Sequence, residues 1–71
     1  MAISYIVPDF VYDNIDSIKT IRKTLKISLG ELSKETGISL LWISRIEDGD
    51  QLPSRAAYNK LAKVFDWEVW N

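Results

Sequence analysis

The stretch of residues 28–49 constrains this chain most, because it carries start and stop signals for two short helices. Ser28 can cap the first helix, and Glu31 follows three residues later, as a capping box requires. Gly37 can end that helix in the left-handed conformation, which costs glycine little. Ser39 can then cap a second helix. The stretch therefore predicts two helices joined by a tight turn.

The apolar residues of this stretch recur with the period of a helix. Leu32 falls on the inner face of the first helix, and Ile43 and Ile46 fall three residues apart on the second. The two predicted helices cover residues 29–36 and 40–48. This arrangement is typical of a helix-turn-helix, whose second helix usually enters the major groove of DNA.

The same periodicity predicts a further helix before this pair, over residues 14–26, with a cap at Asn14 or Asp13. Arg22 lies on the apolar stripe of this helix, so it needs a carboxylate partner if it is buried. The apolar members of that stripe are Ile15, Ile18, Ile21 and Leu25.

A fourth helix is predicted over residues 55–65, where Ser54 can act as its cap. Its inner stripe is expected to contain Ala57, Leu61, Val64 and Phe65, flanked by Tyr58 and Ala62. The tail, residues 67–71, could form one helical turn or a short strand. Its two tryptophans, Trp67 and Trp70, are expected either to cover an end of the core or to form a dimer contact.

Residues 1–13 are predicted to be an extended N-terminal arm, because β-branched and aromatic residues dominate and Pro8 interrupts the segment. The arm could pack on its own helical core or pair with a second subunit. Insertion into a DNA groove suits it least, since the segment is acidic. Residues 14–66 would form the helical core of one domain.

Composition narrows the class of protein. Seventy-one residues make one small domain, and there is no cysteine or histidine to supply a disulfide, a general base or the usual metal ligands. We therefore expect no enzymatic activity, no cofactor and no metal site. No apolar run approaches 20 residues and the N-terminus lacks signal-peptide features, so we expect a soluble cytoplasmic protein without a membrane segment.

The net charge of −1 argues mildly against nucleic acid as a partner, because proteins that bind it are usually basic. The charges are unevenly distributed, however. Basic segments at residues 17–26 and 53–71 flank an acidic segment at residues 27–52.

Residues 15–66 resemble the helix-turn-helix domain of the Xre family, the group of the lambdoid phage repressors and Cro. The resemblance implies an all-α, compact bundle of four or five helices of the lambda repressor-like type. It also implies an ion pair between Arg22 and Glu47. The residues that carry it are Ile21 and Arg22, Leu32, Gly37, the run from Trp42 to Glu47 with Gly49, and Pro53 with Ser54.

The resemblance also implies a DNA-binding surface. The outward positions of the second helix of the motif would be Ser39, Leu40, Leu41, Ser44 and Arg45, with Asp48 repelling a nearby phosphate. Phosphate contacts would come from Lys26, Ser28, Ser54 and Arg55. Arg45 can form two hydrogen bonds to a guanine edge. Alternatively it is a surface arginine paired with Glu35 or Asp48.

Several residues depart from the family pattern. Leu29 replaces a glutamine that often begins the first helix of the motif, and Lys26 replaces a glycine that often precedes it. Trp42 has family precedent as a packing residue. Leu40 and Leu41 replace polar residues, so they either touch thymine methyl groups or bind a protein.

Two functions follow from the resemblance as expectations. The first is a sequence-specific transcriptional regulator of the Cro/Xre type, from a phage, plasmid or other mobile element, that binds double-stranded DNA as a homodimer. The second is a protein-interaction module on the same scaffold, such as an antirepressor or an accessory factor that binds another regulator.

Overall fold

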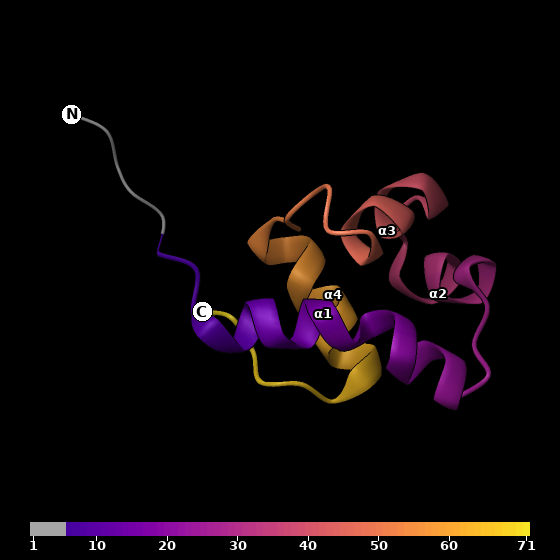
Figure 1. The fold of residues 1–71 in the computed structure, drawn as a ribbon, viewed down its shortest axis with the longest axis horizontal. Helices are drawn as coiled ribbons and strands as arrows, with labels where there is room; N and C mark the ends of the chain where they lie inside the picture. Colours follow the sequence, from indigo (N-terminus) through magenta and orange to yellow (C-terminus); the bar gives the residue numbers. More distant parts are fainter. Residues whose placement is uncertain (1–5) are drawn as a thin grey trace.

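The computed structural model describes residues 6–71, and these residues form four α-helices without a β-strand (Figure 1). The all-α bundle expected from the sequence is therefore confirmed. Figure 1 shows α2 and α3 together at one end of the molecule, while the C-terminus lies near the start of α1 at the other. The helices are α1 (Asp9–Thr24), α2 (Leu29–Thr36), α3 (Leu40–Glu47) and α4 (Arg55–Phe65).

Helix α1 begins five residues earlier than the sequence pattern predicted. The prediction of an extended arm is therefore wrong for residues 9–13. Pro8 occupies the N-cap position, where its missing N–H costs nothing and its φ of −60° suits a helix start. Val11 is fully buried on the same face as Ile15 and Ile18. Burial of this apolar stripe outweighs the β-propensity of the segment. The remainder of the predicted arm, residues 1–5, lies outside the described residues.

Helix α1 also ends two residues earlier than predicted, in a Schellman motif. Lys26 adopts a left-handed φ of +57°, and the N–H of Ile27 donates to the carbonyl of Arg22 at 2.9 Å. Leu25 falls outside the helix and is exposed, so it does not belong to the apolar stripe as predicted. A lysine thus occupies a backbone conformation that glycine adopts at less cost.

Replacing Lys26 with glycine is expected to raise the free energy of unfolding by about 0.5–1 kcal/mol. Relief of the left-handed strain exceeds the extra chain entropy that glycine adds to the unfolded state. Thermal unfolding monitored by circular dichroism measures this change. As a control, Lys19→Gly in the middle of α1 should lower stability by about 1 kcal/mol. A lower melting temperature for the Lys26 variant would contradict the assignment of strain.

The caps predicted for the other three helices are all present. Ser28 and Glu31 form both hydrogen bonds of the capping box at the start of α2. The Ser39 and Ser54 hydroxyls accept hydrogen bonds from backbone amides in the first turns of α3 and α4. Gly37 adopts a left-handed φ of +74° at the end of α2. These local signals explain why α2 and α4 have the predicted bounds and why α3 is only one residue shorter.

The core lies where all four helices meet, and Tyr58 of α4 occupies its centre. Tyr58 is fully buried, although the sequence pattern placed it at the edge of the inner stripe. Its hydroxyl accepts a hydrogen bond from Asn14 and donates one to the carbonyl of Glu68, both at 2.9 Å. A buried tyrosine is stable here because both polar capacities of its hydroxyl are used. The other buried apolar residues are Val11, Ile15, Ile18, Leu32, Ile38, Ile43, Ile46, Leu61, Ala62 and Trp70.

The C-terminal tail packs on this core without forming a helix or a strand. Trp67 stacks on Tyr58 with ring centroids 5.9 Å apart, and Trp70 meets the same ring edge-on at 6.0 Å. Asn59 holds Trp70 by two hydrogen bonds of 2.8 Å to its backbone N–H and carbonyl. The tryptophans therefore cover an end of the core, as one of the two sequence interpretations expected.

Arg22 and Glu47 tie α1 to the end of α3. The Nε of Arg22 donates to Oε2 of Glu47 at 2.9 Å, and its Nη2 donates to Oε1 at 3.3 Å. The Nη1 of Arg22 donates to the carbonyl of Ile27 at 2.9 Å. The two side chains are only 12% and 2% exposed. The pair implied by the resemblance is present, and it supplies the carboxylate that a half-buried arginine requires.

Candidate nucleic-acid interface

Helix α3 presents one face to the core and the other to solvent. Ile43 and Ile46 are fully buried, whereas Leu40 and Leu41 are 49% and 62% exposed. Ser44 and Arg45 lie one helical turn beyond these leucines and therefore share their face. Ser44 is half-buried and Arg45 is exposed. The structure thus brings the predicted residues of α3 together on one outer face.

Trp42 extends this outer face, although the sequence resemblance suggested a packing role. Its side chain is 37% exposed, and it adjoins Leu40 and Leu41. Three consecutive large apolar residues at the start of α3 thus reach solvent. The hydropathy of this run was visible in the sequence, but the exposure of Trp42 depends on how α3 is rotated against the core.

Arg45 has no ion-pair partner within residues 6–71, because the Arg22–Glu47 pair accounts for the only contact of this kind there. Neither Glu35 nor Asp48 forms the pairing considered as the alternative. All five donor N–H groups of the guanidinium remain available to a ligand. Arg45 is therefore the strongest hydrogen-bond donor on the outer face of α3.

The start of α2 is poorly suited to a phosphate. The carboxylate of Glu31 accepts a hydrogen bond from the N–H of Ser28 at 3.3 Å, so a negative charge already occupies this helix terminus. The hydroxyl of Ser28 accepts a hydrogen bond from the N–H of Glu31 at 3.0 Å. A phosphate would have to displace or approach a carboxylate here, which like-charge repulsion opposes. Lys26, two residues earlier, is exposed and has no carboxylate contact among residues 6–71.

The start of α4 is better suited to an anion than the start of α2. Its first turn contains no acidic residue, and Ser54 and Arg55 are both exposed. The guanidinium of Arg55 lies over the ring of Trp70, with its Cζ 5.6 Å from the ring centroid. This cation–π contact orients the arginine while leaving its N–H edge able to donate. The sequence alone did not indicate that Trp70 would position Arg55.

Leu29, which replaces a glutamine of the family pattern, is half-buried and packs against the core. It therefore contributes little to an exposed apolar surface.

The serine hydroxyls at the starts of α2, α3 and α4 all accept a hydrogen bond from a backbone amide, so each retains one hydrogen to donate to a ligand.

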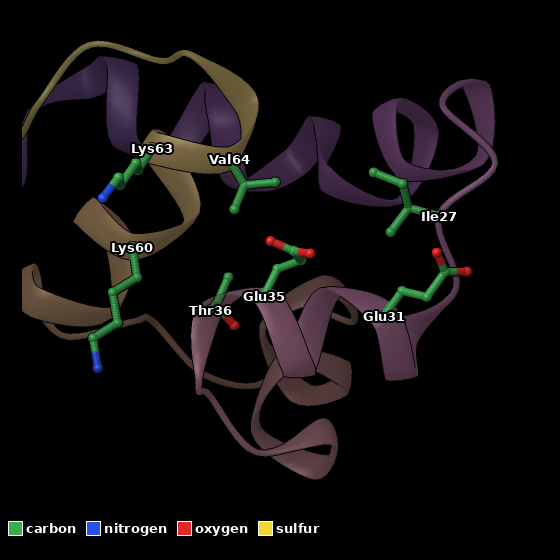
Figure 2. A pocket seen from close by; sticks show the side chains of 7 residues that line it. All are labelled: Ile27, Glu31, Glu35, Thr36, Lys60, Lys63 and Val64. Atoms are coloured by element: carbon green, nitrogen blue, oxygen red, sulfur yellow. The ribbon is translucent and has the colours of Figure 1, made fainter.

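A groove of about 610 Å³ lies between the outer sides of α2 and α4 (Figure 2). Glu31 and Glu35 line one side, and Lys60 and Lys63 line the other. In Figure 2 the two lysine side chains point away from the carboxylates, and no ion pair joins them. Because both signs of charge are equally represented, this groove does not extend a phosphate-binding surface. Its remaining lining residues are Ile27, Thr36 and Val64.

Among the helices formed by residues 6–71, none is both long enough and apolar enough to cross a membrane. A family model described as a helix-turn-helix domain matches residues 17–67, a span that contains α2, α3 and α4 and the second half of α1. No curated protein and no solved structure matches the chain.

Proposed function

Because this chain belongs to the helix-turn-helix domain family, we propose that it is a DNA-binding transcriptional regulator of the Cro/Xre type. It would bind double-stranded DNA as a homodimer on a palindromic operator, in the cytoplasm of a host cell. A phage, plasmid or other mobile element is the proposed source. The observation that carries this proposal is the outer face of α3, where Arg45, unpaired within residues 6–71, projects from a helix whose C-terminal end is tied to α1 by the Arg22–Glu47 pair.

Recognition would begin with the outer face of α3 in the major groove. Arg45 would donate two hydrogen bonds to a guanine edge, the commonest specific contact of this kind. Leu40 and Leu41 would contact the methyl groups of thymine. Ser39 and Ser44 would donate to a base or to a phosphate. With one strong base contact per subunit, specificity would depend on pairing two half-sites about one helical turn apart.

Affinity would come from a small number of phosphate contacts. Lys26, Ser54 and Arg55 are exposed and suited to them, whereas Ser28 is disfavoured by the adjacent carboxylate of Glu31. Since each neutralised phosphate contributes about 0.9 to the slope of log affinity against log salt, this slope should be shallow. Because the net charge is −1, affinity would depend on these few placed cations and not on the overall charge of the protein.

Arg45→Ala is expected to weaken binding to the operator by about 1–3 kcal/mol, or about 5- to 150-fold, because it removes the two hydrogen bonds to guanine. The measurement is a gel-shift titration against DNA surrounding the gene, at two salt concentrations. Lys60→Ala, on the far side of the α2–α4 groove, is the matched control and should change affinity less than about twofold. Binding that is absent at low salt, or unaffected by salt, would contradict the proposal.

The exposed apolar run of Leu40, Leu41 and Trp42 favours a second candidate function, in which α3 binds another regulator. An apolar surface of this kind is more typical of protein contacts than of base readout. The double variant Leu40→Ser with Leu41→Ser, measured in the same operator titration, distinguishes the two candidate functions. A regulator that reads thymine methyl groups loses operator affinity, whereas an accessory factor keeps or gains affinity for DNA and loses its protein partner.

A further inference from the structure

The ring of Trp70 lies between the core and the first turn of α4. It forms a T-shaped pair with Tyr58, with ring centroids 6.0 Å apart, and the Cζ of Arg55 lies over it at 5.6 Å from its centroid. Asn59 fixes the backbone of Trp70 by two hydrogen bonds of 2.8 Å. Because Arg55 and Asn59 are four residues apart on α4, they share one face of that helix. One residue of the C-terminal tail thus connects the core to a surface arginine.

Trp70 is the fixed partner of this contact, and Arg55 is the adjustable one. Trp70 is only 7% exposed, whereas Arg55 is exposed and forms no ion pair within residues 6–71. A surface arginine has many rotamers, and ordering it when a ligand binds costs free energy. A cation–π contact at an exposed site favours one arrangement by about two- to fivefold. The buried ring therefore restricts Arg55 before any ligand arrives.

A guanidinium that lies over a ring can still bind an anion. The ring contacts the face of the planar group, while its N–H donors lie in the plane and point outward. The first turn of α4 contains no acidic residue that would compete for these donors. Of the residues within 6–71 that line the adjacent groove of about 720 Å³, Arg55 alone is charged. Arg55 is therefore the group that an anion meets at this end of α4.

We propose that Trp70 is a positioning residue for the phosphate contact of Arg55, which makes the C-terminal tail part of the DNA-binding apparatus. This proposal rests on the proposed function, because Arg55 has a phosphate to bind only if the protein binds DNA. Trp70 acts through Arg55: it reduces the conformational freedom that the arginine loses when the complex forms. Because a phosphate contact carries no sequence information, Trp70 raises affinity for the operator and for other duplexes alike.

Substitutions of Trp70 should weaken DNA binding only while Arg55 is present. Trp70→Leu removes the aromatic face and should lower affinity about two- to fivefold for each bound subunit. In an Arg55→Ala background the same substitution should leave affinity unchanged. Trp70→Phe keeps a weaker aromatic face and should give an intermediate loss. The measurement is a fluorescence-anisotropy titration with the full chain, on the DNA surrounding the gene and on a mixed-sequence duplex.

Two controls separate positioning from loss of charge and from a loosened tail. Arg55→Ala should reduce the slope of log affinity against log salt by about 0.9 for each bound subunit, whereas Trp70→Leu keeps the cation and should leave this slope unchanged. Trp67→Leu also removes a ring that packs on Tyr58, but the cation–π contact of Arg55 is with Trp70. Its affinity for DNA should equal that of the wild type. Circular dichroism confirms that each variant is folded at the temperature of the titration.

The contact between Trp70 and Arg55 can also be measured without DNA. The ring current of Trp70 should shift the side-chain NMR resonances of Arg55 upfield, and Trp70→Leu should abolish this shift. The proposal is overturned if the shift is absent, if Trp70→Leu costs the same affinity with and without Arg55 or none at all, or if Trp67→Leu costs as much. A wild-type chain that binds neither duplex at low salt gives a different result: it overturns the proposed function, and this proposal with it.

Discussion

Arg22→Ala is expected to lower the free energy of unfolding by about 3–5 kcal/mol, because it leaves the carboxylate of Glu47 buried without its cation. Glu47 is 2% exposed and receives both of its side-chain hydrogen bonds from Arg22. The carbonyl of Ile27 loses a donor in the same variant. For a domain of this size such a loss approaches the whole stability of the fold, so the variant should unfold at or near room temperature.

Urea denaturation of wild type and variant measures this effect. Lys23→Ala, at the neighbouring exposed position of α1, is the matched control and should change stability by less than about 0.5 kcal/mol. Replacing both members of the pair, as Arg22→Met with Glu47→Leu, should recover much of the loss, because no charge then remains buried. An Arg22→Ala variant with the melting temperature of the wild type would contradict a stabilising role for the pair.

Tyr58→Ala is expected to cost about 3–5 kcal/mol, since it removes the ring at the centre of the core. Phe10, Trp67 and Trp70 all contact this ring. Tyr58→Phe keeps the ring and removes only the hydroxyl, so its cost should be about 1–3 kcal/mol. In that variant the side chain of Asn14 and the carbonyl of Glu68 lose their partner.

Thermal unfolding measures both variants, and tryptophan fluorescence reports on the tail. Because Trp67 and Trp70 pack on Tyr58, Tyr58→Ala should shift their emission to longer wavelength as the tail becomes solvated. Tyr12→Phe is the control, because Tyr12 is exposed and its hydroxyl makes no hydrogen bond within residues 6–71. Equal stability of Tyr58→Phe and the wild type would show that the hydroxyl does not anchor the tail.

The helices that the sequence predicted well are those with local start and stop signals. Ser28, Ser39 and Ser54 mark their own helix starts by bonding amides three residues away, and Gly37 marks an end through its backbone alone. Such interactions need no distant part of the chain. They explain why the bounds of α2 and α4 could be predicted to the residue.

The start of α1 could not be predicted in the same way, because no side-chain cap marks it. Residues 10–12 have high β-propensity, and only contacts with the rest of the core favour a helix there. Val11 becomes buried once the other helices are assembled. The central position of Tyr58 was missed for a related reason, since its partners Asn14 and Glu68 come from opposite ends of the chain.

For the candidate interface, the outward positions of α3 came from the sequence resemblance, and the helical period agrees with them. Helical period places Leu40, Leu41, Ser44 and Arg45 opposite the buried isoleucines wherever the helix packs. The sequence also placed Arg22 on an apolar stripe, and the resemblance paired it with Glu47.

Only the tertiary structure decided which charges remain available and which surfaces remain uncovered. Within residues 6–71 it leaves Arg45 without a carboxylate partner, and it sets Arg55 over Trp70. These features join residues that are far apart in the chain, so their geometry depends on how the helices and the tail pack. Local periodicity specifies which face of a helix is apolar. Long-range packing specifies which side chains from distant parts of the chain contact that face and the residues around it.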